Sequence, residues 1–175
     1  MNREQLRALQ APIKERYRKE PASALVTLRA EGSLGEGVTC SVDTGRALVA
    51  AGLHPATGGD GMSVCSGDLV LQALVACAGV TLSAVATSLG LTVRGGRLVA
   101  EGDLDFRGTL GVAKDVPVGF TAIRLHLTLD TDAGEEQRRK LLELTERYCV
   151  VYQTLLHGAG VTLYDRTELS SPPVS

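Results

Sequence analysis

Residues 66–90 read SGDLVLQALVACAGVTLSAVATSLG, and this stretch decides the fold. Its single charged residue, Asp68, lies near its start, where the helix dipole favours a negative charge. Ser66 is a suitable N-cap and Gly90 a natural stop, so the stretch predicts a helix over about 67–88. The helix is apolar on nearly all sides, and we expect it to be buried on nearly all sides. Its many small and weakly polar residues favour a core helix over a membrane span.

Strands and further helices are expected on both sides of this central helix. The clean alternation of apolar and polar residues over 123–129 indicates a strand with one buried face. The expected strands are 23–31, 38–43, 46–50, 92–106, 121–130 and 161–168, and the expected later helices are 133–148 and 150–156. This order of a β-meander, a buried helix, a β-hairpin, helices and a last strand predicts an α+β fold with two antiparallel sheet units.

The chain is expected to form one domain over residues 22–169. A polar, amphipathic helical arm precedes it at 1–21, and Pro12 should kink or split that helix. A loose tail follows at 170–175. A helix that is apolar all round needs more cover than a chain of 175 residues offers, so we expect a second subunit to supply it.

Composition narrows the possible partners and the compartment. The net charge is only −2, and no basic stripe with interleaved aromatic residues occurs, so neither nucleic acid nor a membrane surface is an expected partner. The N-terminal residues are polar and charged, without a secretory signal, which predicts a reducing, cytoplasmic location for the four cysteines. None of the cysteines forms a CxxC motif and no His lies at ligand spacing, so no metal and no cofactor are expected.

Two cysteines stand out from the other two by their context. Cys77 lies in the middle of the predicted buried helix, and Cys149 lies in ELTERYCVVYQTL, at the junction of two predicted helices. At the start of the second of these helices, backbone N–H groups favour a thiolate. Cys40 is expected in the core of its strand, and Cys65 is expected to be a partly buried loop residue.

The surroundings of Cys77 and Cys149 resemble the two cysteine motifs of the OsmC/Ohr family of thiol peroxidases. The first resemblance is an acidic residue, an aliphatic run and a Cys followed by small residues; the second is ERYCVVYQTL after an amphipathic helix. The resemblance to this family covers residues 23–168. It implies an intertwined homodimer, in which the central helices pack together and the active site lies at the interface. It also implies that the Cys77 thiolate attacks a hydroperoxide, that Cys149 resolves the sulfenic acid as a disulfide, and that an external dithiol reduces it.

The sequence differs from the resembled family at the two side chains, a Glu and an Arg, that stabilise the reactive thiolate there. A Glu ten residues before the first Cys is replaced here by Gly67, and Leu34 stands near the position of the family's Arg, in GSLGEG. Asp68, Arg29 and Arg46 are possible supporting residues in their place. The alternative is that both arginines face solvent and Asp68 only serves the helix terminus.

Two functions therefore remain open from the sequence. The first is a peroxidase that reduces organic hydroperoxides or hydrogen peroxide through the cysteine pair. The second is a non-catalytic homodimer that binds a small apolar or thiol ligand at the interface. Tyr148, Tyr152 and Tyr164 either line an apolar pocket or pack ordinarily, and His54 and Cys65 stand near the site in sequence without an assigned role.

Overall fold

The computed structural model describes residues 2–19, 31–34, 39–43, 48–111 and 113–165. Its helices are α1 (Arg3–Lys19), α2 (Ser66–Leu89), α3 (Phe106–Thr109), α4 (Glu135–Tyr148) and α5 (Val150–His157), with one 3-10 turn, η2 (Pro55–Thr57). Its strands are β1 (Glu31–Leu34), β2 (Thr39–Asp43), β3 (Leu48–Gly52), β4 (Val64–Cys65), β5 (Val93–Leu104) and β6 (Phe120–Thr131). The predicted α+β class is confirmed.

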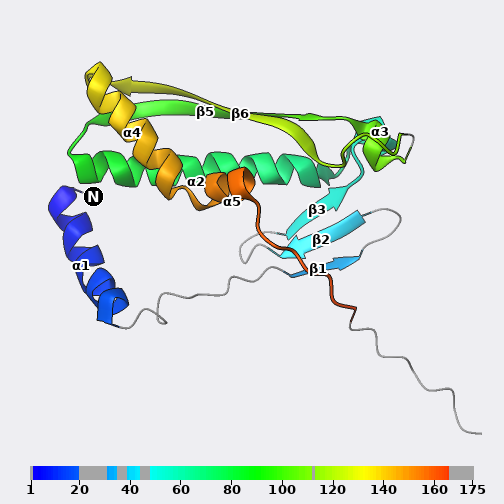
Figure 1. Ribbon diagram of the computed structural model, residues 1–175, viewed down its shortest axis with the longest axis horizontal. Helices are drawn as coiled ribbons and strands as arrows, with labels where there is room; N and C mark the ends of the chain where they lie inside the picture. The colour runs from blue at the N-terminus through cyan, green and yellow to red at the C-terminus, as the bar shows by residue number, and fades with distance from the viewer. Residues whose placement is uncertain (1, 20–30, 35–38, 44–47, 112, 166–175) are drawn as a thin grey trace, which may run out of the picture.

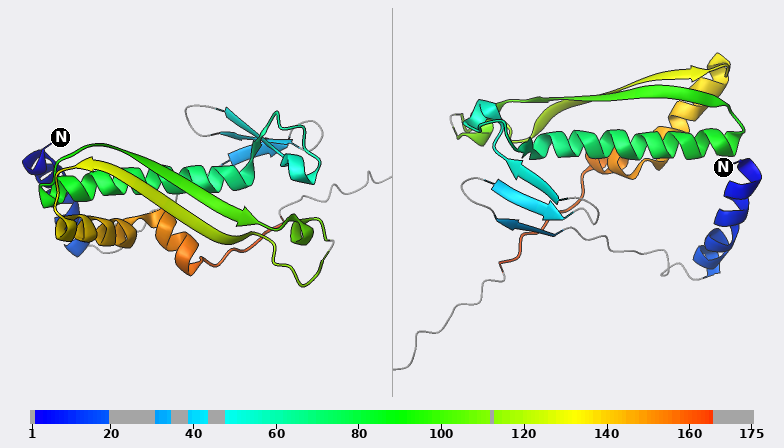
Figure 2. Two further views of the ribbon diagram at one scale, coloured as in Figure 1. Left: turned by 90° about the horizontal axis from the view of Figure 1, so that it is seen from above. Right: turned by 180° about the vertical axis from the view of Figure 1, so that it is seen from behind.

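The long helix α2 is the axis of the molecule (Figure 1). The β5–β6 hairpin runs along one side of it and α4 and α5 lie on another, while the β1–β4 sheet stands near its N-terminal end (Figures 1 and 2). Gly90 ends the helix as predicted, at φ 71°, with its N–H bonded to the Ala86 and Thr87 carbonyls. The start lies one residue earlier than expected, so Cys65 rather than Ser66 is the N-cap.

The hairpin has the buried face that the sequence predicts. Its strands pair antiparallel, with Leu98 opposite Leu127, and the apolar residues of 123–129 are half-buried while the polar ones are exposed. Gly102 allows the Phe120 ring to lie against the backbone of β5, because a Cβ at this position would overlap with the ring. The hairpin thereby holds an aromatic side chain close to α2.

The predicted strands at 38–43 and 46–50 are present in the β1–β4 sheet as β2 and β3, and β1 pairs antiparallel with β2 as β2 does with β3. The short strand β4 adds a parallel pairing, with Val64 opposite Ala51, and leads directly into α2. The expected strand at 23–31 lies outside the described residues except for its last position, where β1 begins.

Within the described residues of one chain, α2 is buried along one side only, and the second subunit expected to cover the rest of the helix stays a prediction. The buried residues form one stripe, Leu74, Ala78, Leu82, Val85 and Ala86, which faces α4 and the hairpin. Val80, on another side, is 73% exposed. By length and composition alone α2 could cross a membrane, but its apolar stripe packs here inside a mixed α+β layer structure. The exposed apolar side remains uncovered because the elements of a single chain cover only part of the helix.

Two terminal expectations also differ from the structure. Helix α1 runs unbroken from Arg3 to Lys19, so Pro12 does not split it; proline fits the helical φ and removes a single N–H donor. Residues 161–165 form no strand, and Val161 and Leu163 are almost fully exposed. A strand needs a partner strand, and none of the described strands pairs with these residues.

Candidate thiol site

Cys149 is fixed by the helices on both sides of it. It ends α4 and caps α5, and its side chain is almost completely buried, at 1% exposure. Its N–H donates to the Thr145 carbonyl at 3.0 Å, and its carbonyl accepts from the Gln153 N–H at 2.9 Å. Its extended backbone, at φ −75° and ψ 108°, makes the sharp turn from one helix into the next. The thiol therefore has a defined position at the start of α5.

Cys77 meets this thiol from the middle of α2. The two residues lie far apart in the sequence, but α5 packs against α2 and brings the two thiols close enough for each to shift the pKa of the other. Both cysteines are free thiols in the structure, and Cys77 is only half-buried. The sequence-predicted pair is therefore brought together, with one member accessible and the other enclosed.

The surroundings of Cys77 favour its thiolate. Burial by itself raises the pKa of this thiol, but hydrogen bonds donated to the sulfur outweigh it. They come from the backbone N–H of Val151, the Cys149 thiol, the Thr81 hydroxyl and the backbone N–H of Val150. The net result is a pKa for Cys77 below the ordinary value of a cysteine. A lowered pKa is typical of a nucleophilic cysteine.

Cys149 has the opposite character. Burial raises the pKa of its thiol, and the neighbouring Cys77 raises it further, while the Tyr152 N–H opposes the shift. The pair therefore combines a thiol whose pKa is lowered with a neighbouring thiol whose pKa is raised, an arrangement suited to a two-cysteine reaction.

A mainly apolar cavity of about 310 Å³ is lined by close sequence neighbours of both cysteines, although by neither cysteine itself. Leu74, one helical turn before Cys77, forms part of its wall, and Tyr152, three residues after Cys149, forms another part. The remaining walls come from the β6 hairpin strand and the end of α5: Phe120, Thr121, Ala122, Ile123, Leu125, Leu155 and Leu156. Burial and the nearby Glu146 raise the pKa of Tyr152, so its phenol is a neutral hydrogen-bonding group in an otherwise apolar wall.

The other residues near the N-terminus of α2 belong to a separate cavity of about 350 Å³. It contains Cys65, Asp68 and His54, whose ring stacks on Phe106 with centroids 5.0 Å apart. His54 Nδ1 accepts from the Ala56 N–H at 3.1 Å and caps the 3-10 turn. At a rise of about 1.5 Å per residue, Asp68 lies roughly 14 Å and Cys65 roughly 18 Å before Cys77 along the axis of α2.

The structure separates the other candidates from the cysteine pair or does not describe them. Arg29 and Arg46 lie outside the described residues, as does the side chain of Cys40. Tyr148 is exposed beneath the guanidinium of Arg147, and Tyr164 is exposed in the C-terminal segment, so of the three tyrosines Tyr152 alone lines the cavity.

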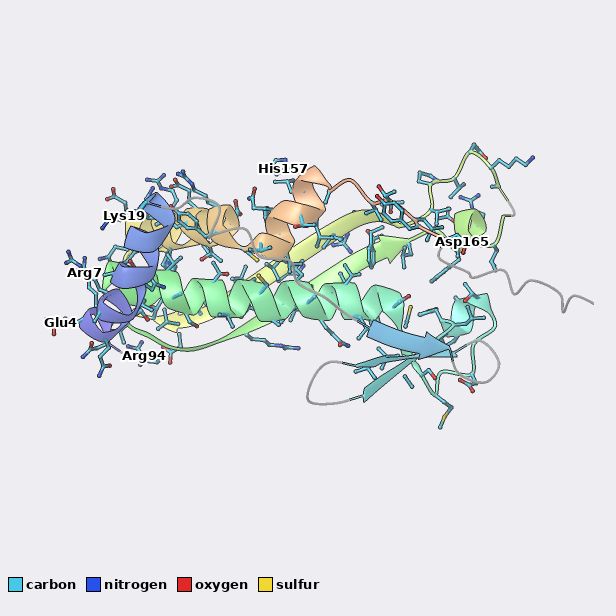
Figure 3. The ribbon with its side chains drawn as sticks, turned by 90° about the horizontal axis from the view of Figure 1, so that it is seen from below. Glu4, Arg7, Lys19, Arg94, His157 and Asp165 are labelled. Carbon is cyan, nitrogen blue, oxygen red and sulfur yellow. The ribbon has the colours of Figure 1, made fainter. Side chains whose placement is uncertain are left out.

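The two remaining histidines lie away from the thiols. His126 is exposed on the outer face of the hairpin, and its Nε2 lies 3.3 Å from Oε2 of Glu101. His157 lies at the far end of α5 (Figure 3). Within the described ranges, no three His, Cys, Asp or Glu side chains come together as a metal site would require.

Thr81 was not identified from the sequence. It lies four residues after Cys77, on the same face of α2, and its hydroxyl helps to lower the pKa of that thiol. Ser83 and Thr87, on the same helix, donate instead to the carbonyls of Gly79 and Ser83, at 2.9 and 2.8 Å. The spacing of four residues was the available signal, but a threonine in a helix is usually a back-bonded residue of this ordinary kind.

The structure thus has an α+β fold with a half-buried cysteine on its central helix, and a second cysteine lies next to it. These features define the class as α+β proteins with a pair of neighbouring thiols. The chain belongs to the family of OsmC-like proteins, whose model matches residues 58–163, more than half of the sequence. No curated protein matches this sequence.

Solved structures share the fold at low sequence identity. An OsmC-like protein from Mycoplasma pneumoniae superposes with a TM-score of 0.64 at 16% identity, covering 76% of this chain and 89% of that one. An organic hydroperoxide resistance protein from Legionella pneumophila gives 0.60 at 18%, covering 77% and 92%. The organic hydroperoxide resistance protein OhrB of Bacillus subtilis gives 0.52 at 19%, covering 77% and 94%.

Proposed function

We propose that this protein is a thiol-dependent peroxidase that reduces organic hydroperoxides, or hydrogen peroxide, with Cys77 as the attacking thiol and Cys149 as the resolving thiol. The observation that carries the proposal is the pairing of two neighbouring thiols of opposite character: the pKa of Cys77 is lowered, and the pKa of the enclosed Cys149 is raised. The structural similarity to organic hydroperoxide resistance proteins agrees with this chemistry.

The reaction proceeds in three balanced steps. The Cys77 thiolate attacks the outer oxygen of ROOH, the O–O bond breaks, and the products are Cys77 sulfenic acid and an alkoxide that takes up a proton to become the alcohol. The Cys149 thiol then displaces the hydroxyl group of the sulfenic acid, forming the disulfide and releasing water. A small external dithiol reduces this disulfide and leaves as its own disulfide, so two electrons pass from the dithiol to the hydroperoxide.

The cavity suits the organic part of such a substrate. Its walls are aliphatic and aromatic apart from Thr121 and Tyr152, and it begins one turn from Cys77. An alkyl or aryl group bound in this cavity would be removed from water, and the hydroperoxide end of the substrate would lie towards the thiol pair. Hydrogen peroxide has no such group to bury, so an organic hydroperoxide is the expected better substrate.

The working form in this proposal is a homodimer in the reducing cytoplasm. The exposed apolar residues on α2 and at the start of α5, including Val80 at 73% and Val150 at 70% exposure, favour a second copy as cover for this side. A reducing compartment would keep Cys77 and Cys149 as the free thiols that the reaction needs.

A second function has one observation in its favour. The acidic and basic residues expected from the family are replaced by Gly67 and Leu34. A chain that has lost peroxidase activity would keep the fold and the cavity, and the dimer would bind a small apolar or thiol compound without consuming it.

One experiment separates the two functions. The reduced protein is mixed with cumene hydroperoxide or hydrogen peroxide, free thiols are counted over seconds to minutes, and mass spectrometry locates any disulfide. A peroxidase loses two thiols rapidly, forms a Cys77–Cys149 link and reacts faster with cumene hydroperoxide. Slow oxidation spread over all four cysteines would contradict the proposal and leave ligand binding as the function.

A further inference from the structure

Phe120, the first residue of β6, belongs to the walls of two cavities. It lines the cavity of about 310 Å³ that contains Leu74 and Tyr152, and it also lines the cavity of about 350 Å³ at the N-terminal end of α2. Of the described residues, it alone is shared by both linings. A single side chain therefore separates the space near the thiol pair from the space that contains Cys65.

Two glycines provide the room that the Phe120 ring occupies. A Cβ on Gly102 of β5 would overlap with the ring, and a Cβ on Gly67, in the first turn of α2, would lie 3.5 Å from Phe120 Cζ. The absence of side chains at these two positions lets the ring lie between the hairpin and the central helix. The ring is thus enclosed by backbone from both elements, which favours a fixed position for it.

We propose that Phe120 determines the length of the organic group that the thiol site accepts. With the ring in place, the cavity beside Tyr152 ends at Phe120, and its size suits a compact aryl or branched alkyl group. Without the ring, the two cavities would join into one channel that leads towards the N-terminal end of α2. The meaning of this for hydroperoxides rests on the proposed function, but the binding that it predicts does not.

The terminal cavity has an apolar wall next to the ring, which is formed by Leu71 and Leu104. A chain end that passed the ring would therefore be removed from water. Gly67, beside the ring, lies roughly 15 Å before Cys77 along the axis of α2. A compact aryl group with its reactive end at the thiol does not extend this far, whereas a long alkyl chain does. Long chains are the ligands that the ring should exclude.

The test measures binding of alcohols, which are the products of hydroperoxide reduction and do not oxidise thiols. Cumyl alcohol carries a compact group and 1-decanol a long one, and each is titrated into the reduced full-length protein by isothermal titration calorimetry. The wild type should prefer cumyl alcohol. Phe120→Ala should bind 1-decanol about tenfold more tightly than the wild type does, because the chain gains the second cavity. Its affinity for cumyl alcohol should stay the same or fall.

Two further variants complete the experiment. Phe106→Leu changes an aromatic residue that lines the terminal cavity alone, and it should leave both affinities in place. Phe120→Leu keeps an apolar side chain of smaller size, so it should fold even if Phe120→Ala does not, and it should shift the preference in the same direction by less. An equal change for both alcohols, or no gain for 1-decanol in a folded Phe120 variant, would overturn the inference.

The outcomes for this inference and for the proposed function are distinct. If the wild type fails to consume cumene hydroperoxide but Phe120→Ala gains affinity for 1-decanol, the ring limits chain length as inferred and the peroxidase proposal fails. If cumene hydroperoxide is consumed rapidly and the folded Phe120 variants show no gain for the longer alcohol, the peroxidase proposal stands and this role of Phe120 is wrong.

Discussion

Helix α2 carries a cysteine at each of two places, and their surroundings differ. Cys65 caps the N-terminus of the helix, in a cavity with His54 and Asp68, and no second described cysteine accompanies it there. Cys77, three turns further on, is paired with Cys149 and accepts several hydrogen bonds. The same helix thus carries a terminal thiol and a central thiol. The comparison teaches that the neighbouring element, α5, distinguishes them, because its first residues and Cys149 act on the pKa of the central thiol.

The largest effect should follow from removing the central thiol. Cys77→Ser is expected to reduce hydroperoxide consumption to the background of the buffer, because no other thiol that the structure describes is placed to form the sulfenic acid beside Cys149. Cys65→Ser serves as the matched control and should keep the wild-type rate. Stopped-flow or xylenol-orange assays with cumene hydroperoxide measure both. Equal losses in the two variants would show that the two places belong to one site.

The next effect concerns the partner of the central thiol. Cys149→Ser should still react once, since Cys77 remains, but should lose one thiol per chain instead of two and accumulate sulfenic acid. Turnover with an external dithiol should fall strongly while the first reaction remains. Trapping with dimedone and intact-mass measurement detect the sulfenic acid. Full two-thiol loss in this variant would assign the resolving role to Cys65 or Cys40.

A smaller effect is expected at the cavity. Leu156 lines it and is 61% exposed, so Leu156→Trp should fill space without disturbing the core. The rate with cumene hydroperoxide should fall by about tenfold, while that with hydrogen peroxide should hardly change. Leu163→Trp, at a site that is 96% exposed and outside the cavity, is the control. Parallel losses with both substrates would remove the cavity from the proposal.

The smallest effect lies at the other end of α2. His54→Ala removes the cap of the 3-10 turn and the stacking on Phe106, which should cost about 1 kcal/mol of unfolding free energy. Urea unfolding followed by circular dichroism measures this change. The hydroperoxide rate should be unaffected at a temperature where the variant is folded. A lower rate with unchanged stability would connect the terminal cavity to the reaction.

The sequence predicted those parts of the fold that depend on local signals. Helix α2, the hairpin and the helices around Cys149 were located to within a few residues, because capping residues, glycine stops and periodicity are properties of short segments. The strand expected at 161–168 is wrong for residues 161–165, the part that the structure describes. Strand formation depends on what packs alongside, which no local pattern encodes.

The residues of the candidate site likewise fall into those that the sequence could predict and those that it could not. Cys77 and Cys149 were selected from their motifs, and the structure places them together. Thr81 and the α5 donors could not be selected, since a threonine in a helix is common and a backbone N–H has no sequence signal of its own. Asp68 was considered as a supporting residue, but helix geometry places it roughly 14 Å from Cys77 along α2.

At the turn around Cys149, the number of residues between α4 and α5 matters more than the identity of their side chains. Any residue except proline can replace Val150 or Val151 and still present the same N–H group. One inserted residue between α4 and α5, however, would rotate α5 by about 100° and carry its donors away from the sulfur. Relatives that share this arrangement are therefore to be recognised by constant spacing across this junction, even where the letters around it have changed.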